Sequence, residues 1–470
     1  MKVPLKLGAY EAKSIIANAQ RCVNLYVENN PEDSPFPTTH YLMPGTQVVA
    51  TSTERGWRGL YFANNQKLYG VCGRRVYAIS NAWALTELGQ IASAQGQVNM
   101  IDNGSTIILV DGSSAGYTIR LDDDLFAPIT QDSFYGGNTV QYGDGFFVLP
   151  RPGTNQFYIS LAFEANFDAL DFAGKTGFSD KLVTLQVTKR YIYLLGALTS
   201  EVWYNSGGSA FPYERMPGTF IQHGCIAADS AAQMDGAVFW LSQSKEGKCL
   251  VVRTENYEAK RISTHAIENE FQKYARVDDA FGYTMQFEGH FFYVLTFPTA
   301  NKTWAFDLST NQWSEWLWLD EQGRLNRHRS SCFAYAYGSL VVGDWEDGRL
   351  YELRQDVMTD DGGPIARIRS FPHFVDDGNR VMYRELIADF QVGEGDSHGE
   401  VPVYLRWSDT KGASWGNQVE ESFGLEGDYL KSVQFQRLGM ARDRVFELSW
   451  SAPVKTALNG AFVQPIPANQ

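Results

Sequence analysis

The stretch "DNGSTIILVDG" (residues 102–112) decides the fold, because a tight polar turn leads directly into a very apolar strand. Asp-Gly and Asn-Gly turns between apolar runs are strong hairpin signals, since both residues tolerate positive φ. The same pattern recurs as "ANNQKLYGVCG" (63–73), "GDGFFVLPR" (143–151), "VTKRYIYLLG" (187–196), "MDGAVFWLS" (234–242), "FEGHFFYVL" (287–295) and "AYGSLVVGDW" (336–345). The recurrence predicts an all-β protein built from antiparallel hairpins.

The hairpin turns recur roughly every 40–50 residues, the spacing of propeller blades with several strands each. A third, aromatic-bearing strand follows many of them, as in "RRVYAIS" (74–80) and "KTWAFDL" (302–308). We therefore expect a β-propeller of about seven blades across residues 57–356, with six blades and a divergent unit as the alternative. The last unit lacks an obvious fourth strand. "TQVVATS" (46–52) can supply it and close the ring.

The rhythm of the repeats defines a division of the chain into three parts. Residues 1–45 contain the proline-rich stretch 29–45 and are expected to form an irregular N-terminal arm. The propeller is assigned to residues 46–356. After the break "MTDDGGPI" (358–365), strands without blade spacing predict a β-sandwich-like domain over 357–470.

Helix is scarce, and one candidate lies between the fifth and sixth units. In "STHAIENEFQKY" (263–274), Ile267, Phe271 and Tyr274 fall on one helical face. Ser263 or Thr264 can cap the N-terminus of this helix.

Composition limits the partners of the chain. There are 54 Asp and Glu against 40 Lys and Arg, for a net charge of −14. A field of that sign repels nucleic acid and anionic membranes, so specific binding to either is not expected. With no apolar run or signal peptide, the chain is expected to be made and assembled in the cytoplasm. The five scattered cysteines predict free buried thiols and no metal site.

"RWSDTKGASWG" (406–416) resembles the Asp-box hairpin of sialidases and raises the possibility of a sugar-cleaving propeller. A glycosidase also needs two carboxylates that flank the bond. The stretch occurs once, outside the repeats, with Thr410 in place of the Asp. We interpret it as a structural turn in which side chains bond the backbone and Trp415 packs beneath.

Several other residues have a functional and a structural interpretation. His223 and Cys225 lie two apart and could form a base–nucleophile pair, "LDDD" (121–124) could bind a cation, and Trp313, Trp316 and Trp318 could stack sugars. Asp168, Asp171, Asp344 and Asp347 are candidate acids. Each also has a structural interpretation. His223 and Cys225 can simply lie on one face of a strand, and "LDDD" can be a solvated turn. The tryptophans can pack between blades, and the aspartates can lie in turns or on the surface. We therefore predict no catalytic, cofactor-binding or metal-binding residue and no cofactor.

Several long stretches resemble the packaged-DNA stabilisation protein family of short-tailed bacteriophages of the Salmonella type. They are "NAQRCVNLYVE" (18–28), "FYISLAFEANFDALDFA" (157–173), "EVWYNSGGSAFPYERMPGTFIQHGCIA" (201–227), "VFWLSQ" (238–243), "TWAFDLSTNQWSEW" (303–316) and "RLGMARDRVFELSWSAPVKTALNGA" (437–461). They run in order along nearly the whole chain.

The resemblance implies a non-enzymatic, propeller-bearing virion protein of podoviruses. It implies a tail hub that joins after DNA packaging as a ring of six, beneath the portal and its adaptor ring. That ring closes the portal vertex with the tail needle and helps to seat the tailspikes. The alternative that the residues leave open is a propeller-scaffold glycan hydrolase or a carbohydrate-binding module.

Overall fold

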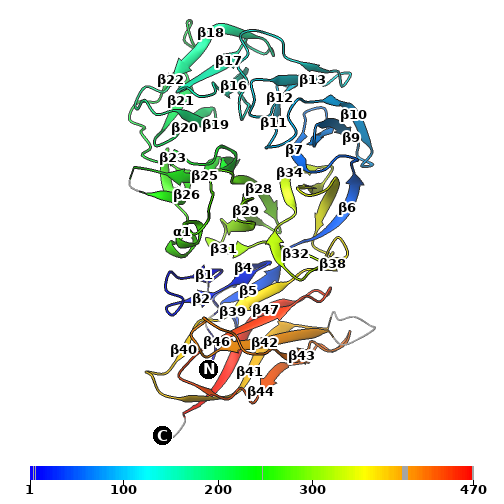
Figure 1. Cartoon of the computed structure of the whole chain (residues 1–470), viewed down its shortest axis with the longest axis vertical. Coiled ribbons are helices and arrows are strands. Elements are labelled where there is room, and N and C mark those ends of the chain that lie inside the picture. The colour runs from blue at the N-terminus through cyan, green and yellow to red at the C-terminus, as the bar shows by residue number, and fades with distance from the viewer. Residues whose placement is uncertain (4, 6, 246, 394–400, 468–470) are drawn as a thin grey trace.

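The computed structural model describes the chain apart from residues 4, 6, 246, 394–400 and 468–470. In this part of the chain, seven consecutive sheets with four or more strands form a ring, and a two-layer β-structure lies at one end of the molecule (Figure 1). The all-β propeller predicted from the repeats is confirmed, with seven blades.

Blades 1 to 4 are simple four-stranded antiparallel sheets in chain order. Blade 1 contains β7 (Trp57–Phe62), β8 (Leu68–Cys72), β9 (Arg75–Ile79) and β10 (Leu85–Gln90). Blade 2 contains β11 (Asn99–Asp102), β12 (Thr106–Val110), β13 (Gly116–Arg120) and β14 (Phe126–Pro128). Blade 3 contains β15 (Gln141–Gly143), β16 (Phe146–Pro150), β17 (Gln156–Ser160) and β18 (Phe167–Gly174). Blade 4 contains β19 (Leu182–Thr188), β20 (Tyr191–Gly196), β21 (Ser200–Asn205) and β22 (Tyr213–Arg215).

Blades 5 to 7 are more elaborate. Blade 5 contains β23 (Gly224–Cys225), the 3-10 helix η1 (Ala228–Ser230), β24 (Ala232–Met234), β25 (Ala237–Gln243), β26 (Lys248–Glu255) and β27 (Glu258–Arg261). Blade 6 contains β28 (Phe281–Phe287), β29 (His290–Phe297), β30 (Lys302–Asp307) and β31 (Gln312–Glu315). The small hairpin of β32 (Leu317–Leu319) and β33 (Leu325–Arg327) leads to blade 7, with β34 (Ser330–Ala336), β35 (Ser339–Asp344) and β36 (Arg349–Arg354).

The predicted helix is α1 (His265–Phe271), between blades 5 and 6. The Thr264 hydroxyl caps it by accepting a hydrogen bond from Ile267 N at 3.4 Å. Ile267 and Phe271 are buried against blades 5 and 6, which explains why this short segment folds as a helix.

A strand from the N-terminal side closes the ring. β6 (Gly45–Thr51) pairs antiparallel with β36 and forms the outer strand of blade 7, as "TQVVATS" predicted. Two short strands, β37 (Thr359–Asp360) and β38 (Gly363–Pro364), extend the same sheet beyond β6. Blade 7 is therefore assembled from segments some 300 residues apart.

The apolar second strands are buried on both faces because each blade is packed between two others. In β12, Ile107 and Leu109 lie in the core between blades 1 and 2. Ile108 and Val110 point the opposite way, into the core between blades 2 and 3. Successive residues of a strand face opposite sides, so a continuous apolar run fills both cores.

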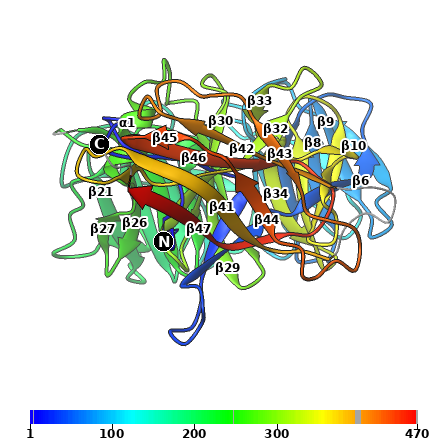
Figure 2. The ribbon, with the colours of Figure 1, turned by 90° about the horizontal axis from the view of Figure 1, so that it is seen from below.

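The lower end of the molecule in Figure 1 is a sandwich of two sheets. One layer has β3 (Cys22–Val23), β39 (Arg367–Ser370), β46 (Asp443–Trp450), β42 (Pro402–Ser408) and β43 (Val419–Ser422), with β40 (Phe374–Val375) paired to β46. The other has β4 (Leu25–Asn29), β5 (Thr38–Leu42), β47 (Ala457–Pro467), β41 (Val381–Gln391) and β44 (Val433–Gln436), with β45 (Met440–Ala441) paired to β41. Figure 2 views the sandwich from below, with β41 beside β47.

Residues 1–45 are not the irregular arm that the prolines suggested. A small hairpin of β1 (Tyr10–Glu11) and β2 (Ala19–Gln20) is followed by β3, β4 and β5, and β5 pairs with β47 through His40 and Leu458. Three of the prolines of residues 29–45 occupy the turn between β4 and β5, and Pro44 lies between β5 and β6. Apolar residues such as Leu25 and Val27 are buried in the sheet. The three-part division into 1–45, 46–356 and 357–470 stays a prediction about domains.

β3 joins the two parts of the molecule. Val23 pairs in parallel with Glu315 of blade 6 and antiparallel with Ile368 of the sandwich. Blade 6 and one sandwich layer are therefore a single ten-stranded sheet. One hydrophobic core also runs from blades 5 and 6 into the sandwich.

Candidate functional site

The inner strands surround a small cavity on the propeller axis, of about 170 Å³. Every blade contributes to its wall, and the polar side chains are mostly amides and hydroxyls: Gln97, Asn99, Asn138, Thr139, Thr184 and Gln186. Such a volume holds about six water molecules and is too small for a nucleic-acid duplex.

Hydrogen bonds between neighbouring blades encircle this cavity. They connect blade 3 to blade 4 (Asn138 Nδ2 to Val183 O, 2.6 Å), blade 4 to blade 5 (Gln186 Nε2 to Ala231 O, 2.9 Å) and blade 7 to blade 1 (Ser331 Oγ to Trp57 O, 2.6 Å). Hydrogen bonds that are buried or partly buried, as these are, are costly to break. The polar groups at the axis thus hold the blades together.

Two charged side chains line the cavity among the described residues, Arg58 and Asp229. The Arg58 guanidinium donates to backbone carbonyls of Gly73, Ser93 and Gly96 at 2.8–2.9 Å, so it is occupied by structural bonds. Asp229 is exposed to the cavity, and desolvation by the surrounding wall raises the pKa of its carboxyl to about 6. A single carboxylate does not provide the acid–nucleophile or acid–base pair of a glycosidase.

The His223–Cys225 pair has the geometry of a structural element. Cys225 Sγ donates to Ala227 O at 3.0 Å, and His223 Nδ1 lies 3.2 Å from Ser242 Oγ. Burial raises the pKa of the Cys225 thiol to about 12, which keeps it protonated and poorly nucleophilic. All five cysteines are buried, as their scattered positions predicted.

The acidic candidates lie in three separate segments of the propeller, at residues 121–124, 168–171 and 344–347. "LDDD" (121–124) forms the turn between β13 and β14, where Asp124 accepts from Lys67 Nζ at 2.7 Å. Asp344 is fully buried and accepts from Arg329 Nη1 at 2.7 Å, and Asp347 accepts from Arg349 N at 2.8 Å. In the described part of the chain, no cluster of three or more His, Cys, Asp or Glu could hold a metal ion.

The tryptophan candidates are not a sugar-stacking surface. Trp313 and Trp316 are 1% exposed and belong to the core. Trp318 is half-buried and its ring is covered by the Arg329 guanidinium at 4.0 Å. Core packing accounts for Trp313 and Trp316, and the contact with Arg329 covers Trp318.

"RWSDTKGASWG" is a self-bonded turn after β42. Ser408 Oγ accepts from Gly412 N at 2.8 Å, and Thr410 Oγ1 accepts from Ser414 N at 2.8 Å. Trp415 differs from the expectation, because it is half-exposed and lies against the Arg406 guanidinium at 4.7 Å. The turn is held by its polar side chains more than by a buried tryptophan.

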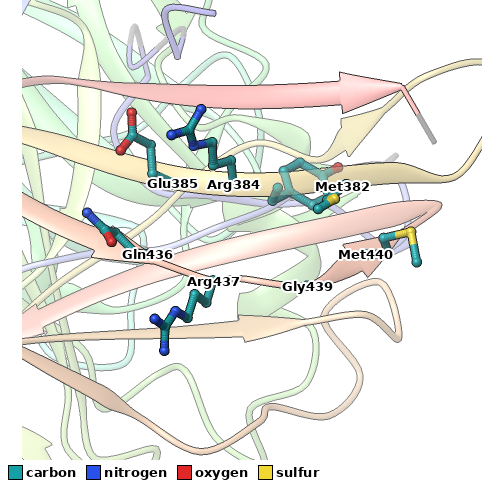
Figure 3. Close-up of a pocket in the computed structure, with 8 residues that line it drawn as sticks. Met382, Arg384, Glu385, Gln436, Arg437, Gly439 and Met440 are labelled. Atoms are coloured by element: carbon teal, nitrogen blue, oxygen red, sulfur yellow. The ribbon is translucent and has the colours of Figure 1, made fainter.

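A groove of about 530 Å³ lies on the outer face of the sandwich, where sequence reasoning predicted no site. It is lined by Met382, Tyr383, Arg384, Glu385, Gln436, Arg437, Gly439 and Met440 (Figure 3). Met382 and Met440 are direct cross-strand partners, 43% and 53% exposed. No sequence signal marks these methionines as outward-facing, because β41 carries apolar residues on both of its faces.

Comparison with known proteins identifies the family. The model of a family described as bacteriophage P22 Gp10, β-propeller, a phage-stabilisation family, matches residues 1–358. The chain belongs to this family. It is therefore a phage structural protein, a virion component of the phage-stabilisation family. The match covers the propeller, whereas the stretch 437–461 lies beyond it.

Other comparisons add little to this assignment. No curated protein matches the chain. Among solved structures, the WD40 β-propeller domain of Doa1 is similar at 13% identity, with 66% of this chain and 97% of that chain covered and a TM-score of 0.41. That score is too low to support an argument about this phage-stabilisation family member. No helix in the described residues is long and apolar enough to cross a membrane.

Proposed function

We propose that this chain is a tail hub that closes the portal vertex of a short-tailed phage after DNA packaging and retains the genome. In this proposal, six copies form a ring that links the portal adaptor ring to the tail needle and the tailspikes. The supporting observation is membership of the phage-stabilisation family over residues 1–358.

The physical character of the propeller supports retention by closure. The net charge of −14 disfavours direct binding to packaged DNA. The axial cavity is small, and interblade hydrogen bonds encircle it. A closely packed body of this kind resists deformation, so it can withstand pressure from one side.

The turns at the two ends of the blades provide separate docking surfaces. Turns such as residues 103–105 in blade 2 join first and second strands, and turns such as residues 111–115 join second and third strands at the opposite end. Because loops tolerate sequence change, each face can adapt to a different tail component. This arrangement suits a protein that connects several partners.

The glycan-hydrolase alternative finds less support. The axial cavity contains Asp229 but no second carboxylate among the described lining residues. The carbohydrate-binding alternative relied on tryptophans, of which Trp313 and Trp316 are buried. We therefore retain the structural function as the proposal.

The test uses phage that lack the gene, grown with and without the wild-type gene supplied in trans. The proposal expects particles that package DNA and then lose it, measured as nuclease-resistant genome per capsid and by electron microscopy of the tail vertex. Supplying the wild-type gene should restore both. Stable, DNA-filled particles with complete tails in the absence of the protein would contradict the proposal.

A further inference from the structure

The outer edge of blade 3 has an exposed apolar projection with two negative charges. One residue of β17, Ile159, lies opposite four residues of β18, residues 168–171, which therefore bulge outward. Asp168 Oδ1 accepts from Leu170 N at 2.9 Å and holds the bulge as a turn. Leu170 is 81% exposed at its tip. We call residues 168–171 the blade-3 knob.

Blade 3 has further exposed apolar side chains besides Leu170. On the same blade, Leu161, Phe163 and Phe172 are 39%, 74% and 37% exposed. Several exposed large apolar side chains in one region indicate an interaction surface more strongly than a single one does. The aspartates of the knob have no ion-pair partner among the described residues. Desolvation and the neighbouring charge of Asp168 raise the pKa of Asp171.

The sandwich groove has the complementary chemistry. Met382 and Met440 form its apolar floor, and Ile466, the β47 partner of Met382, is 42% exposed beside them. Arg384 and Arg437 are exposed, have no ion-pair partner among the described residues, and extend in opposite directions from the groove (Figure 3). Glu385 also lines the groove, beside Arg384, so the guanidinium groups outnumber the carboxylate.

The two surfaces lie at opposite ends of the long axis of the molecule. β18 is at the top of Figure 1, and β41 and β44 are at the bottom. They cannot meet within one chain. A contact between different patches on two copies is head-to-tail, and it continues to a third copy until the rotation closes a ring.

We infer that the chain associates with copies of itself through the blade-3 knob of one copy and the sandwich groove of the next. Leu170 would lie on the methionines, and the Asp168 and Asp171 carboxylates would pair with the Arg384 and Arg437 guanidinium groups. This inference deepens the proposed ring and rests on it, because it names the surfaces through which the ring is made. The occupant of the groove is a second copy, because the knob shares the apolar character of the groove and carries the opposite charge.

Charge-reversal variants of the full chain test the contact. The knob variant is Asp168→Lys with Asp171→Lys, and the groove variant is Arg384→Glu with Arg437→Glu. By sedimentation velocity or mass photometry at about 10 μM and low salt, wild type should form species larger than the 52.7 kDa monomer. Each variant should associate at least about tenfold more weakly, because like charges then face each other.

Mixing distinguishes this contact from a general charge effect. In a mixture, the intact knob of the groove variant faces the intact groove of the knob variant, and the reversed knob faces the reversed groove with opposite charge, so the mixture should regain association beyond the dimer. The chain with all four reversals should regain self-association. Matched controls with the same charge changes at exposed sites, Glu32→Lys with Asp33→Lys and Arg74→Glu with Lys181→Glu, should behave as wild type.

Each outcome decides the question. A wild-type chain that stays monomeric under these conditions would overturn the inference. Association of wild type with no effect of the variants would leave the ring intact and reject only these surfaces. Equal loss in the control variants would show a dependence on net charge and would also reject them. The DNA-retention experiment is independent of all three results.

Discussion

The Ser331 hydroxyl donates a hydrogen bond of 2.6 Å to the backbone carbonyl of Trp57, and this bond joins the seventh blade to the first. The same hydroxyl lies 2.9 Å from Gly343 O within its own blade. The ring is therefore closed in two places. β6 closes it at the outer edge of blade 7, and the Ser331–Trp57 hydrogen bond closes it at the inner edge.

Ser331→Ala should lower the free energy of unfolding by about 1–3 kcal/mol, because it leaves a buried carbonyl without its donor. Guanidinium titration followed by tryptophan fluorescence measures this loss. Ser179→Ala, at an exposed serine, is the control and should have no effect. Equal stability of the two variants would show that closure depends on β6 alone.

Asp409→Asn should destabilise the sandwich. Asp409 accepts from Arg444 Nε at 2.6 Å and Nη2 at 2.7 Å, and the Arg444 side chain is 2% exposed. Removing the charge leaves the buried Arg444 guanidinium uncompensated. The expected cost in free energy of unfolding is about 2–3 kcal/mol, less than for a fully buried pair, because water reaches the half-exposed Asp409. Thermal unfolding should show a lower Tm for this variant than for wild type. The control Asp377→Asn, at an exposed position, should leave the Tm unchanged. A Tm equal to wild type would mean that carbonyls and aromatic rings suffice for Arg444.

Thr410→Val and Thr410→Asp should differ in the 408–416 turn. Valine removes the oxygen that accepts from Ser414 N, which should cost about 1 kcal/mol. Aspartate, the residue of the sialidase motif, keeps an acceptor and should retain wild-type stability. The comparison is made by differential scanning calorimetry. Two variants of equal stability would contradict the role assigned to the hydroxyl.

Asp229→Asn should stabilise the protein in a pH-dependent way. The folded-state pKa of Asp229, about 6, lies above its ordinary value of 3.8, so the folded chain holds a proton that the unfolded chain has released. Stability therefore falls as pH rises between these values, and the loss persists above pH 6. The variant should have a higher Tm than wild type at about pH 8 and the same Tm at about pH 4. A difference that does not change with pH would argue for an effect of packing instead.

The propeller could be predicted from local signals, whereas the interfaces between its parts could not. Residues 107–110 are apolar without interruption, as a strand packed on both sides requires, and the recurrent turns set the number of blades. β3 has two residues, and Val23 pairs with strands around residues 315 and 368, which no local pattern encodes. The sandwich groove was missed for the same reason. Whether Met382 faces the core or solvent depends on which strands flank β41.

The pairing of the N-terminal strands has a consequence for synthesis. β6 pairs with β36, β3 with β39, and β5 with β47. These N-terminal strands leave the ribosome early, and those partners emerge only after hundreds more residues. Until then, β3, β6 and the free edge of the β4–β5 hairpin lack their partner strands, and a chaperone or another nascent chain can bind there. A message cut short before residue 349 should therefore yield an open, aggregation-prone ring rather than a smaller functional propeller.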